Sequence, residues 1–144
     1  MTPRQIELVR VSWSQVLPVA EQAAASFYGR LFTLDPSLAS LFKSDLRAQG
    51  RKLTSMINTV VANLSNLSTL VPAIEDLGRR HVGYGVKSAH YDTVGEALLW
   101  TLETALGDAF TADTREAWTR AYVILSEVMQ SAAERHENAR ALAS

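Results

Sequence analysis

Hydrophobic positions recur at intervals of three and four residues from the first turn of the chain to a polar tail that begins near Ala132. This spacing is that of one face of an α-helix. No segment of useful length shows the strict apolar–polar alternation that indicates a half-buried strand. The pattern therefore predicts an all-α fold of about seven to eight helices around one core.

Proline, glycine and capping residues divide this pattern into segments. The expected helices cover residues 3 to about 17, 19 to about 34, 36–42, 45 to about 66, 69–81, about 89–106, and 112 onward. Gly83 and Gly85 should end the helix that contains His81. The expected N-caps are Thr2 with Gln5 in a capping box, Asp35, Ser68, Ser88 or Asp92, and Thr111.

His81 ends an apolar stripe. Leu70, Ile74 and Leu77 precede it at steps that keep all four residues on one helical face, so the imidazole should point toward the core. Spacing alone favours a core histidine that is hydrogen-bonded to a carbonyl group. The alternative is a ligand to a group bound in the core.

Two more polar residues occupy apolar faces. Tyr28 follows Phe27 in a strongly apolar helix, and Gln49 lies one turn before Leu53. A buried polar group without a partner costs about 1–3 kcal/mol. Taken singly, an amphipathic core tyrosine and a helix-start glutamine need no ligand. Three such residues on three helices are better explained by a shared internal ligand.

Composition narrows the classes of function. The chain has 144 residues, 47% of them apolar and 20% charged, with a formal net charge of −1. This length suits a single domain over residues 1–144, with a tail from 132 that can fray. The charge balance shows no excess of basic residues of the kind that nucleic-acid binding requires. No apolar run is long enough for a membrane span, and no signal peptide is recognisable, so a cytoplasmic location is the default expectation.

The metal chemistry open to this chain is restricted. It has no cysteine and only three histidines, and His90 and His136 do not share ligand spacing with His81. A structural zinc site needs four protein ligands, and a two-histidine iron site needs a second core histidine. A single imidazole suits an iron that a macrocycle already holds.

A set of segments in fixed order gives the chain a family resemblance: SFYGRLF at 26–32, residues 36–42, QGRKL at 49–53, LGRRH at 77–81, Gly85 with Val86, HYDTVGEALL at 90–99, and Ala117-Trp118 with Tyr122. Through these segments the chain resembles the globins over residues 4 to about 130, and in particular bacterial single-domain haemoglobins and the haem domain of flavohaemoglobins. The Gln49-to-His81 separation of 32 residues also matches the distal-to-proximal spacing of that family.

The resemblance implies a globin fold around haem b (iron protoporphyrin IX) and a role for each matching residue. His81 would be the proximal iron ligand, Tyr28 and Gln49 the distal hydrogen-bond donors, and Phe42 the ring that packs against the porphyrin. The remaining residues implied to contact haem or its ligand are Leu53 and Val60 on the distal side, Leu77, Val86, Tyr91, Val94 and Leu98 around the proximal side, and Lys52 beside a propionate.

Resemblance to globins also implies a function. A phenol and an amide that donate to bound oxygen predict tight binding, for oxygen storage, transport or scavenging, with carbon monoxide and nitric oxide as further ligands. The alternative is a nitric oxide dioxygenase that depends on a separate reductase, since the chain has no dinucleotide-binding motif. The sequence leaves open whether the protein is an enzyme. A gas sensor is less favoured, and a monomer or weak homo-oligomer is expected.

One position departs from the flavohaemoglobin pattern. In that family the proximal histidine is coupled to a tyrosine and a glutamate, and Tyr91 matches the tyrosine. The glutamate position falls at Ala133, with Glu134 adjacent and Glu127 farther back. Because one residue rotates a helical side chain by about 100°, we expect the proximal coupling to be weakened or rebuilt.

Overall fold

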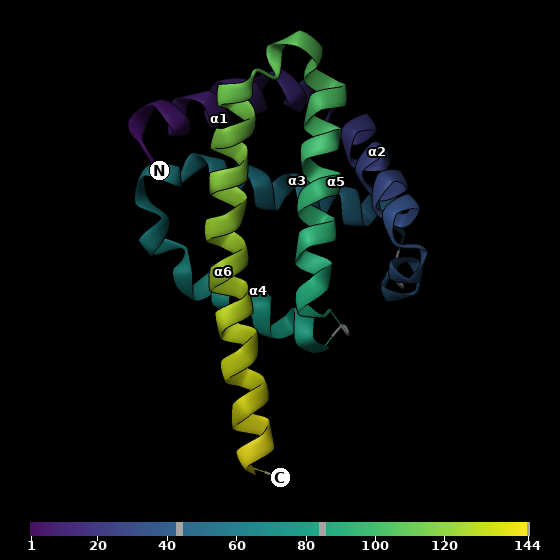
Figure 1. Ribbon diagram of the computed structural model, residues 1–144, viewed down its shortest axis with the longest axis vertical. Coiled ribbons are helices and arrows are strands. Elements are labelled where there is room, and N and C mark those ends of the chain that lie inside the picture. Colours follow the sequence, from purple (N-terminus) through teal and green to yellow (C-terminus); the bar gives the residue numbers. More distant parts are fainter. Residues whose placement is uncertain (43–44, 84–85, 144) are drawn as a thin grey trace.

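The computed structural model describes residues 1–42, 45–83 and 86–143, and within these ranges it contains helices and turns but no strand (Figure 1). The prediction of an all-α fold is confirmed. The elements are α1 (Pro3–Val16), η1 (Leu17–Val19), α2 (Ala20–Leu34), η2 (Pro36–Leu41), α3 (Leu46–Ala62), η3 (Leu64–Thr69), α4 (Val71–Gly83), α5 (Ser88–Leu106), η4 (Gly107–Ala109) and α6 (Ala112–Ala143), where η denotes a 3-10 helix.

Three of the predicted caps are present. The Thr2 hydroxyl accepts a hydrogen bond from the Gln5 backbone at 3.1 Å, and the Gln5 side chain accepts one from the Thr2 backbone at 3.0 Å. The Asp35 carboxylate accepts from the Ser37 backbone, and the Thr111 hydroxyl accepts from the Thr114 backbone. These side chains supply acceptors for backbone N–H groups that have no partner in the first turn of a helix.

The caps predicted at Ser68 and at Ser88 or Asp92 are wrong. Ser68 lies inside η3, where its hydroxyl donates to the Asn66 side chain, and α4 begins only at Val71. Ser88 and Asp92 lie within α5, whose N-cap is Lys87. There the Lys87 backbone N–H donates to Nδ1 of His90 at 2.9 Å, so the imidazole has the role that a glutamate or glutamine side chain has in a capping box.

The predicted long helix over 45–66 is shorter than expected. α3 ends at Ala62, and Asn66 interrupts the following 3-10 segment with φ −146° and ψ 53°. At the other end of this region, α4 runs two residues past the predicted end at His81 and stops at Gly83, the first of the two glycines expected to end it; Gly85 lies outside the described residues. The C-terminal tail continues α6 as a helix to Ala143.

One core cluster joins α1, α3, α5 and α6 around two tryptophans. The rings of Trp13 and Trp118 meet edge to face with centroids 6.1 Å apart. Both indole N–H groups are satisfied: Trp118 donates to the Ser12 hydroxyl at 2.8 Å, and Trp13 donates to the Asn58 side chain at 2.6 Å. This cluster forms the end of the molecule away from the projecting tail of α6 (Figure 1).

Two helix crossings depend on glycine. At the crossing of α4 and α6, a Cβ atom on Gly78 would lie 2.8 Å from the Met129 Cα, so the two backbones are in direct contact. At the crossing of α2 and α3, a Cβ on Gly50 would lie 3.0 Å from the Ala24 Cβ. Close approach of this kind fixes the position of α4, and with it the position of His81.

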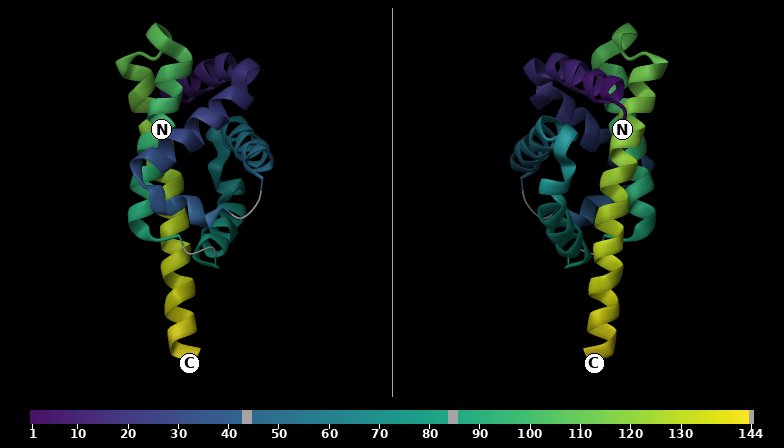
Figure 2. Two further views of the ribbon diagram at one scale, coloured as in Figure 1. Left: turned by 90° about the vertical axis from the view of Figure 1, so that its right-hand side faces the viewer. Right: turned by 90° about the vertical axis from the view of Figure 1, so that its left-hand side faces the viewer.

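The helices divide into two sides. Figure 2 shows α5 and α6 along one side of the molecule and α3 along the other in both views, with α4 between α3 and α6. α6 extends well past the other helices toward the C-terminus. No helix in the part of the chain that the structure describes combines the length and apolar character that crossing a membrane requires.

Candidate functional site

His81 lies near the end of α4, where it is half-buried. Its Nδ1 is 2.7 Å from the carbonyl oxygen of Leu77, one turn earlier. Because a carbonyl oxygen only accepts, Nδ1 carries the proton and Nε2 is left as the nitrogen with a lone pair. Burial lowers the pKa of His81, with Arg80 adding to that effect and the Leu77 hydrogen bond opposing it. The residue is therefore a neutral imidazole with the tautomer that a metal bond through Nε2 requires.

The loop after α4 is tied to the same residue. The backbone N–H of Val86 donates to the His81 carbonyl at 3.0 Å. Val86 is half-buried, and Leu77 is half-buried one turn before His81. Sequence analysis assigned both residues to the haem surroundings, and the structure places them beside the candidate ligand along the chain.

Tyr28 is the centre of an aromatic cluster between α2 and η2. Its side chain is only 6% exposed, and its ring packs against Phe27, Phe32 and Phe42 at centroid distances of 5.1, 6.2 and 5.3 Å. Burial raises the pKa of Tyr28 to about 12. The phenol consequently keeps its proton over the whole physiological range and remains a hydrogen-bond donor.

α3 brings Leu53 against this aromatic cluster, with Gln49 half-buried one turn earlier. Lys52 is exposed on the same helix, as its suggested contact with a propionate at the rim of the site requires. Val60 lies elsewhere: it belongs to the core cluster of Trp13 and Trp118, not to the cluster of Tyr28. The structure thus joins Leu53 to Tyr28 and does not join Val60 to it.

α5 contributes Val94 and Leu98, which pack against the Tyr28 cluster. Tyr91, also on α5, is 7% exposed, and its hydroxyl is buried without a hydrogen-bond partner among the residues that the structure describes. Glu127 and Glu134 are both exposed on α6. Neither carboxylate that sequence analysis considered as a replacement for the proximal glutamate bonds to the Tyr91 hydroxyl.

Tyr91 is held instead through its backbone. The Tyr122 hydroxyl donates to the Tyr91 carbonyl at 2.7 Å, which joins α6 to α5. Burial is the main reason that the pKa of Tyr122 is raised, so this phenol also stays protonated. The position of Tyr91 is therefore set without any bond to its own hydroxyl.

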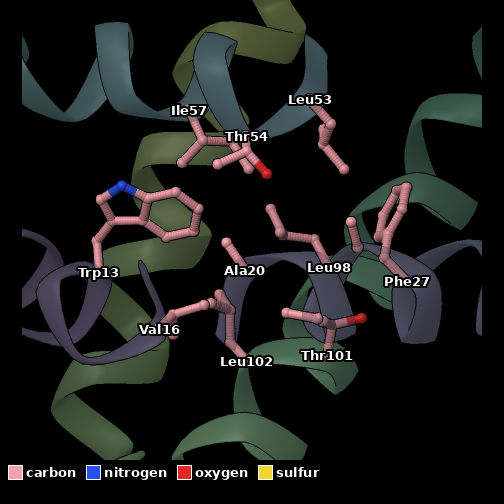
Figure 3. Close-up of a pocket in the computed structure, with 12 residues that line it drawn as sticks. Trp13, Val16, Ala20, Phe27, Leu53, Thr54, Ile57, Leu98, Thr101 and Leu102 are labelled. Carbon is pink, nitrogen blue, oxygen red and sulfur yellow. The ribbon is translucent and has the colours of Figure 1, made fainter. Parts of the chain in front are cut away.

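A small, partly open pocket adjoins the Tyr28 cluster (Figure 3). Its volume is about 30 Å³, and its walls come from α1, α2, α3 and α5. Phe27, Leu53 and Leu98 line it and also belong to the Tyr28 cluster. The Thr101 hydroxyl in its wall already donates to the Ala97 carbonyl at 2.8 Å, so the lining is predominantly apolar.

Five further residues of this site were not predicted from the sequence. Phe27, Leu31, Leu38 and Ala97 are buried in the Tyr28 cluster, and Phe32 packs against it. Phe27 and Leu31 stand four residues apart, and that spacing placed them on the core face of their helix. Periodicity identifies the buried face of a helix but not the element against which that face packs.

Comparison with known proteins places the chain among haem proteins. The sequence model of the globin family matches residues 25–129. A flavohaemoprotein of Bacillus subtilis is 29% identical over 127 residues, and neuroglobin-1 of Oncorhynchus mykiss is 31% identical over 143 residues. These alignments cover 86% and 90% of this chain, but 32% of the flavohaemoprotein and 90% of the neuroglobin. The chain thus spans about a third of the length of the flavohaemoprotein.

A solved structure agrees with this relationship over nearly the whole chain. It is an engineered carbene transferase made from a Rhodothermus marinus protein that carries a provisional description as a nitric oxide dioxygenase. The TM-score is 0.88 at 26% sequence identity, and the alignment covers 98% of this chain and 99% of that one.

The residues present fit the haem that these relatives imply. No group of three or more histidine, aspartate or glutamate residues in the described ranges could hold a bare metal ion. The chain offers one neutral imidazole on α4, and on α2 a protonated phenol within apolar and aromatic walls. That donor set suits an iron whose other ligands come from a porphyrin. With the family model matched over most of its length, the chain belongs to the globin family.

Proposed function

We propose that this globin binds haem b and reversibly binds oxygen with high affinity. The observation that carries the proposal is that one chain has both a neutral His81 imidazole on α4 and a buried, protonated Tyr28 phenol on α2. Haem would supply an iron that His81 holds and that binds a diatomic gas.

His81 would hold the iron through Nε2, with Leu77 keeping the imidazole in the required tautomer. Phe42, at the end of η2, would pack against the porphyrin edge near Tyr28. The other side chains proposed to surround haem are Leu53, Leu77, Val86, Tyr91, Val94 and Leu98, with Lys52 at a propionate. Val60 is the least supported member of the set, because it lies in the other core cluster.

Tyr28 and Gln49 would select among gases. A phenol and an amide each donate a hydrogen bond to a polar ligand and give little to carbon monoxide, which is less polar. A hydrogen bond to a group with charge contributes about 1.5–3 kcal/mol. The burial of Tyr28 excludes water that would compete for its proton. Slow oxygen release is the expected result.

The proximal side favours binding over turnover. A carbonyl acceptor on Nδ1 draws less negative charge onto the imidazole than a carboxylate would. Here the acceptor is the Leu77 carbonyl, and the Tyr91 hydroxyl is not bonded to a glutamate. The iron would thus receive less electron density from His81 than it does where a carboxylate is coupled to the histidine.

A nitric oxide dioxygenase is the second candidate, and the relatives are what favour it. Flavohaemoproteins and a protein provisionally described as a nitric oxide dioxygenase are among the proteins similar to this chain. In that role the chain would depend on a separate reductase. His81, Tyr28 and Gln49 would have the same roles in both functions. The two candidates therefore share one site and differ only in whether the protein converts nitric oxide catalytically.

Optical spectra and kinetics test the proposal. We expect purified protein to show haem absorption, a stable oxygen complex after reduction, and slow oxygen dissociation in stopped flow. Absence of a haem spectrum would contradict the proposed cofactor. Rapid, sustained conversion of nitric oxide to nitrate with a cellular reductase, together with fast oxygen release, would overturn oxygen binding in favour of the second candidate.

A further inference from the structure

Charge is distributed unevenly between the two sides of the molecule. The described residues from 45 to 87 include six lysines or arginines and three aspartates or glutamates. Residues 88–143 include nine acidic residues and four basic ones. The formal net charge of −1 therefore conceals a cationic α3–α4 region and an anionic α5–α6 region.

These regions lie on different sides of the fold. Figure 2 shows α3 across the molecule from α5 in both views, with α4 lying between α3 and α6 and contacting α6. A protein with opposite charges on opposite sides orients in the field of a charged partner and associates preferentially through one face. The cationic α3–α4 region therefore attracts an anionic partner.

Ion pairs neutralise only part of the cationic side. Asp76 contacts Arg79 at 3.8 Å and Arg80 at 3.2 Å, and Glu75 pairs with Arg135 of α6. On α3, Arg47 pairs with Glu21 at 2.8 Å. Arg51 and Lys52 are exposed and form no ion pair with any residue in the described ranges.

The same helix exposes two large apolar side chains. Leu46 is 43% exposed and Met56 is 39% exposed. Met56 is one turn from Lys52, so the methionine and the lysine are neighbours on the surface of α3. Apolar residues with arginine and lysine around them are typical of protein–protein interfaces, where methionine and arginine are enriched. We call Arg51, Lys52 and Met56, which lie within about 140° of one another around the helix axis, the α3 face.

We propose that the α3 face docks an acidic protein that carries one electron to the haem. This inference rests on the proposed function, since oxygen carriage and dioxygenation both require ferrous iron. In the step, the donor loses one electron and iron passes from Fe³⁺ to Fe²⁺, with no atom or proton transferred. The face and the candidate distal residue Gln49 share α3, so the partner would stand within about one helix diameter, roughly 10 Å, of the distal pocket.

Matched charge reversals test the docking face. An acidic plant-type ferredoxin, with a reduction potential of about −400 mV, is a suitable probe. Arg51→Glu and Arg120→Glu change the net charge equally, but Arg120 lies exposed on α6. We expect Arg51→Glu to slow reduction of the ferric protein about threefold or more and to weaken its dependence on ionic strength, with Arg120→Glu having little effect.

An apolar pair of variants probes the centre of the same face. Met56→Glu should slow reduction by ferredoxin more than Arg51→Glu, whereas Val11→Glu, at an exposed position of α1, should not. Reduction by a small uncharged flavin should be the same in all four variants. Equal slowing by Arg51→Glu and Arg120→Glu would overturn the proposal, because only net charge would then matter.

Binding of oxidised ferredoxin, measured by calorimetry, separates the two hypotheses. If ferredoxin binds the wild type and Met56→Glu with equal affinity, the proposed docking at the α3 face is overturned, whatever the haem content of the protein. A wild-type spectrum without haem overturns the proposed function and not the surface. Self-association is the remaining outcome. If the wild-type protein forms a larger species at low salt and Arg51→Glu abolishes it, the α3 face binds the anionic α5–α6 side of a second copy of this chain. That result also overturns the proposal.

Discussion

The two sides of the candidate site are held in place by different parts of the chain. On α4, backbone contact at Gly78 fixes the helix on α6, and a backbone carbonyl orients the His81 ring. On α2, the Tyr28 ring is positioned by other side chains, chiefly Phe27 and Phe42. The proximal residue is thus set by main-chain geometry, whereas the distal residue is set by side-chain packing.

This difference determines what substitution can do on each side. A backbone cannot change its rotamer, so a new atom at the α4–α6 crossing must displace a helix. Aromatic side chains can be exchanged for others of similar volume at modest cost. We therefore expect the proximal side to respond to mutation by loss of haem or of stability, and the distal side by a change in the rate of ligand release.

His81→Gly should give the largest effect. Because α4 contains no second histidine to take its place as an iron ligand, stable haem incorporation should be lost. Free imidazole added to the protein should restore part of the haem spectrum, because the glycine leaves room for the ring. Full haem loading of the variant without imidazole would contradict the role assigned to His81.

Gly78→Ala should follow, as a loss of stability of about 2–3 kcal/mol in urea unfolding, because the new Cβ meets the Met129 backbone. Gly29→Ala provides the control. Gly29 lies within α2, and no neighbouring atom lies within 4 Å of the position that a Cβ would occupy there, so alanine should stabilise the chain by up to about 1 kcal/mol. Equal changes in the two variants would mean that the α4–α6 crossing carries no special constraint.

Tyr28→Phe should leave the free energy of unfolding nearly unchanged, since the ring is retained. Oxygen dissociation should accelerate about tenfold to a hundredfold, which corresponds to the loss of one hydrogen bond to a charged group. Gln49→Leu should act in the same direction. Unchanged dissociation in both variants, measured in stopped flow, would refute the distal donors.

The smallest expected effect is that of pH on the distal side. Burial raises the pKa of Tyr28 to about 12, so the protonated donor persists well above neutrality and is lost only as the pH approaches that value. Oxygen dissociation should accordingly be constant between about pH 7 and pH 10. Acceleration beginning near pH 9 would mean that the phenol titrates as an exposed tyrosine does.

The sequence predicted the fold well because helical periodicity and capping residues are local signals. Thr2, Asp35 and Thr111 cap helices as expected. The cap at Lys87 was missed because its acceptor is the imidazole of His90, a residue type that the capping rules do not include. The early end of α3 arises at Asn63, which leaves helical geometry with φ −113° and ψ 18° and whose side-chain amide donates to the Thr59 carbonyl, a feature that periodicity does not register.

The candidate site was predicted less completely. Periodicity placed Tyr28 and His81 on buried faces, but it could not say that Val60 would pack with the tryptophan core. It also gave no sign of the contact at Gly78, because a glycine looks the same whether its surroundings are open or closed. The hydrogen-bond partner of the His81 Nδ1 could not be predicted either, because it is a main-chain carbonyl group and every residue has one.

The pocket beside the Tyr28 cluster has a volumetric consequence. Space that side chains leave unfilled in the folded state is lost on unfolding, and this loss contributes to the volume decrease that accompanies unfolding. Hydrostatic pressure favours the state of smaller volume, so it acts on the walls of this pocket. Because Phe27 and Leu53 belong to both the pocket wall and the Tyr28 cluster, compression should disturb the ring packing around Tyr28 before it disturbs the backbone contact between α4 and α6.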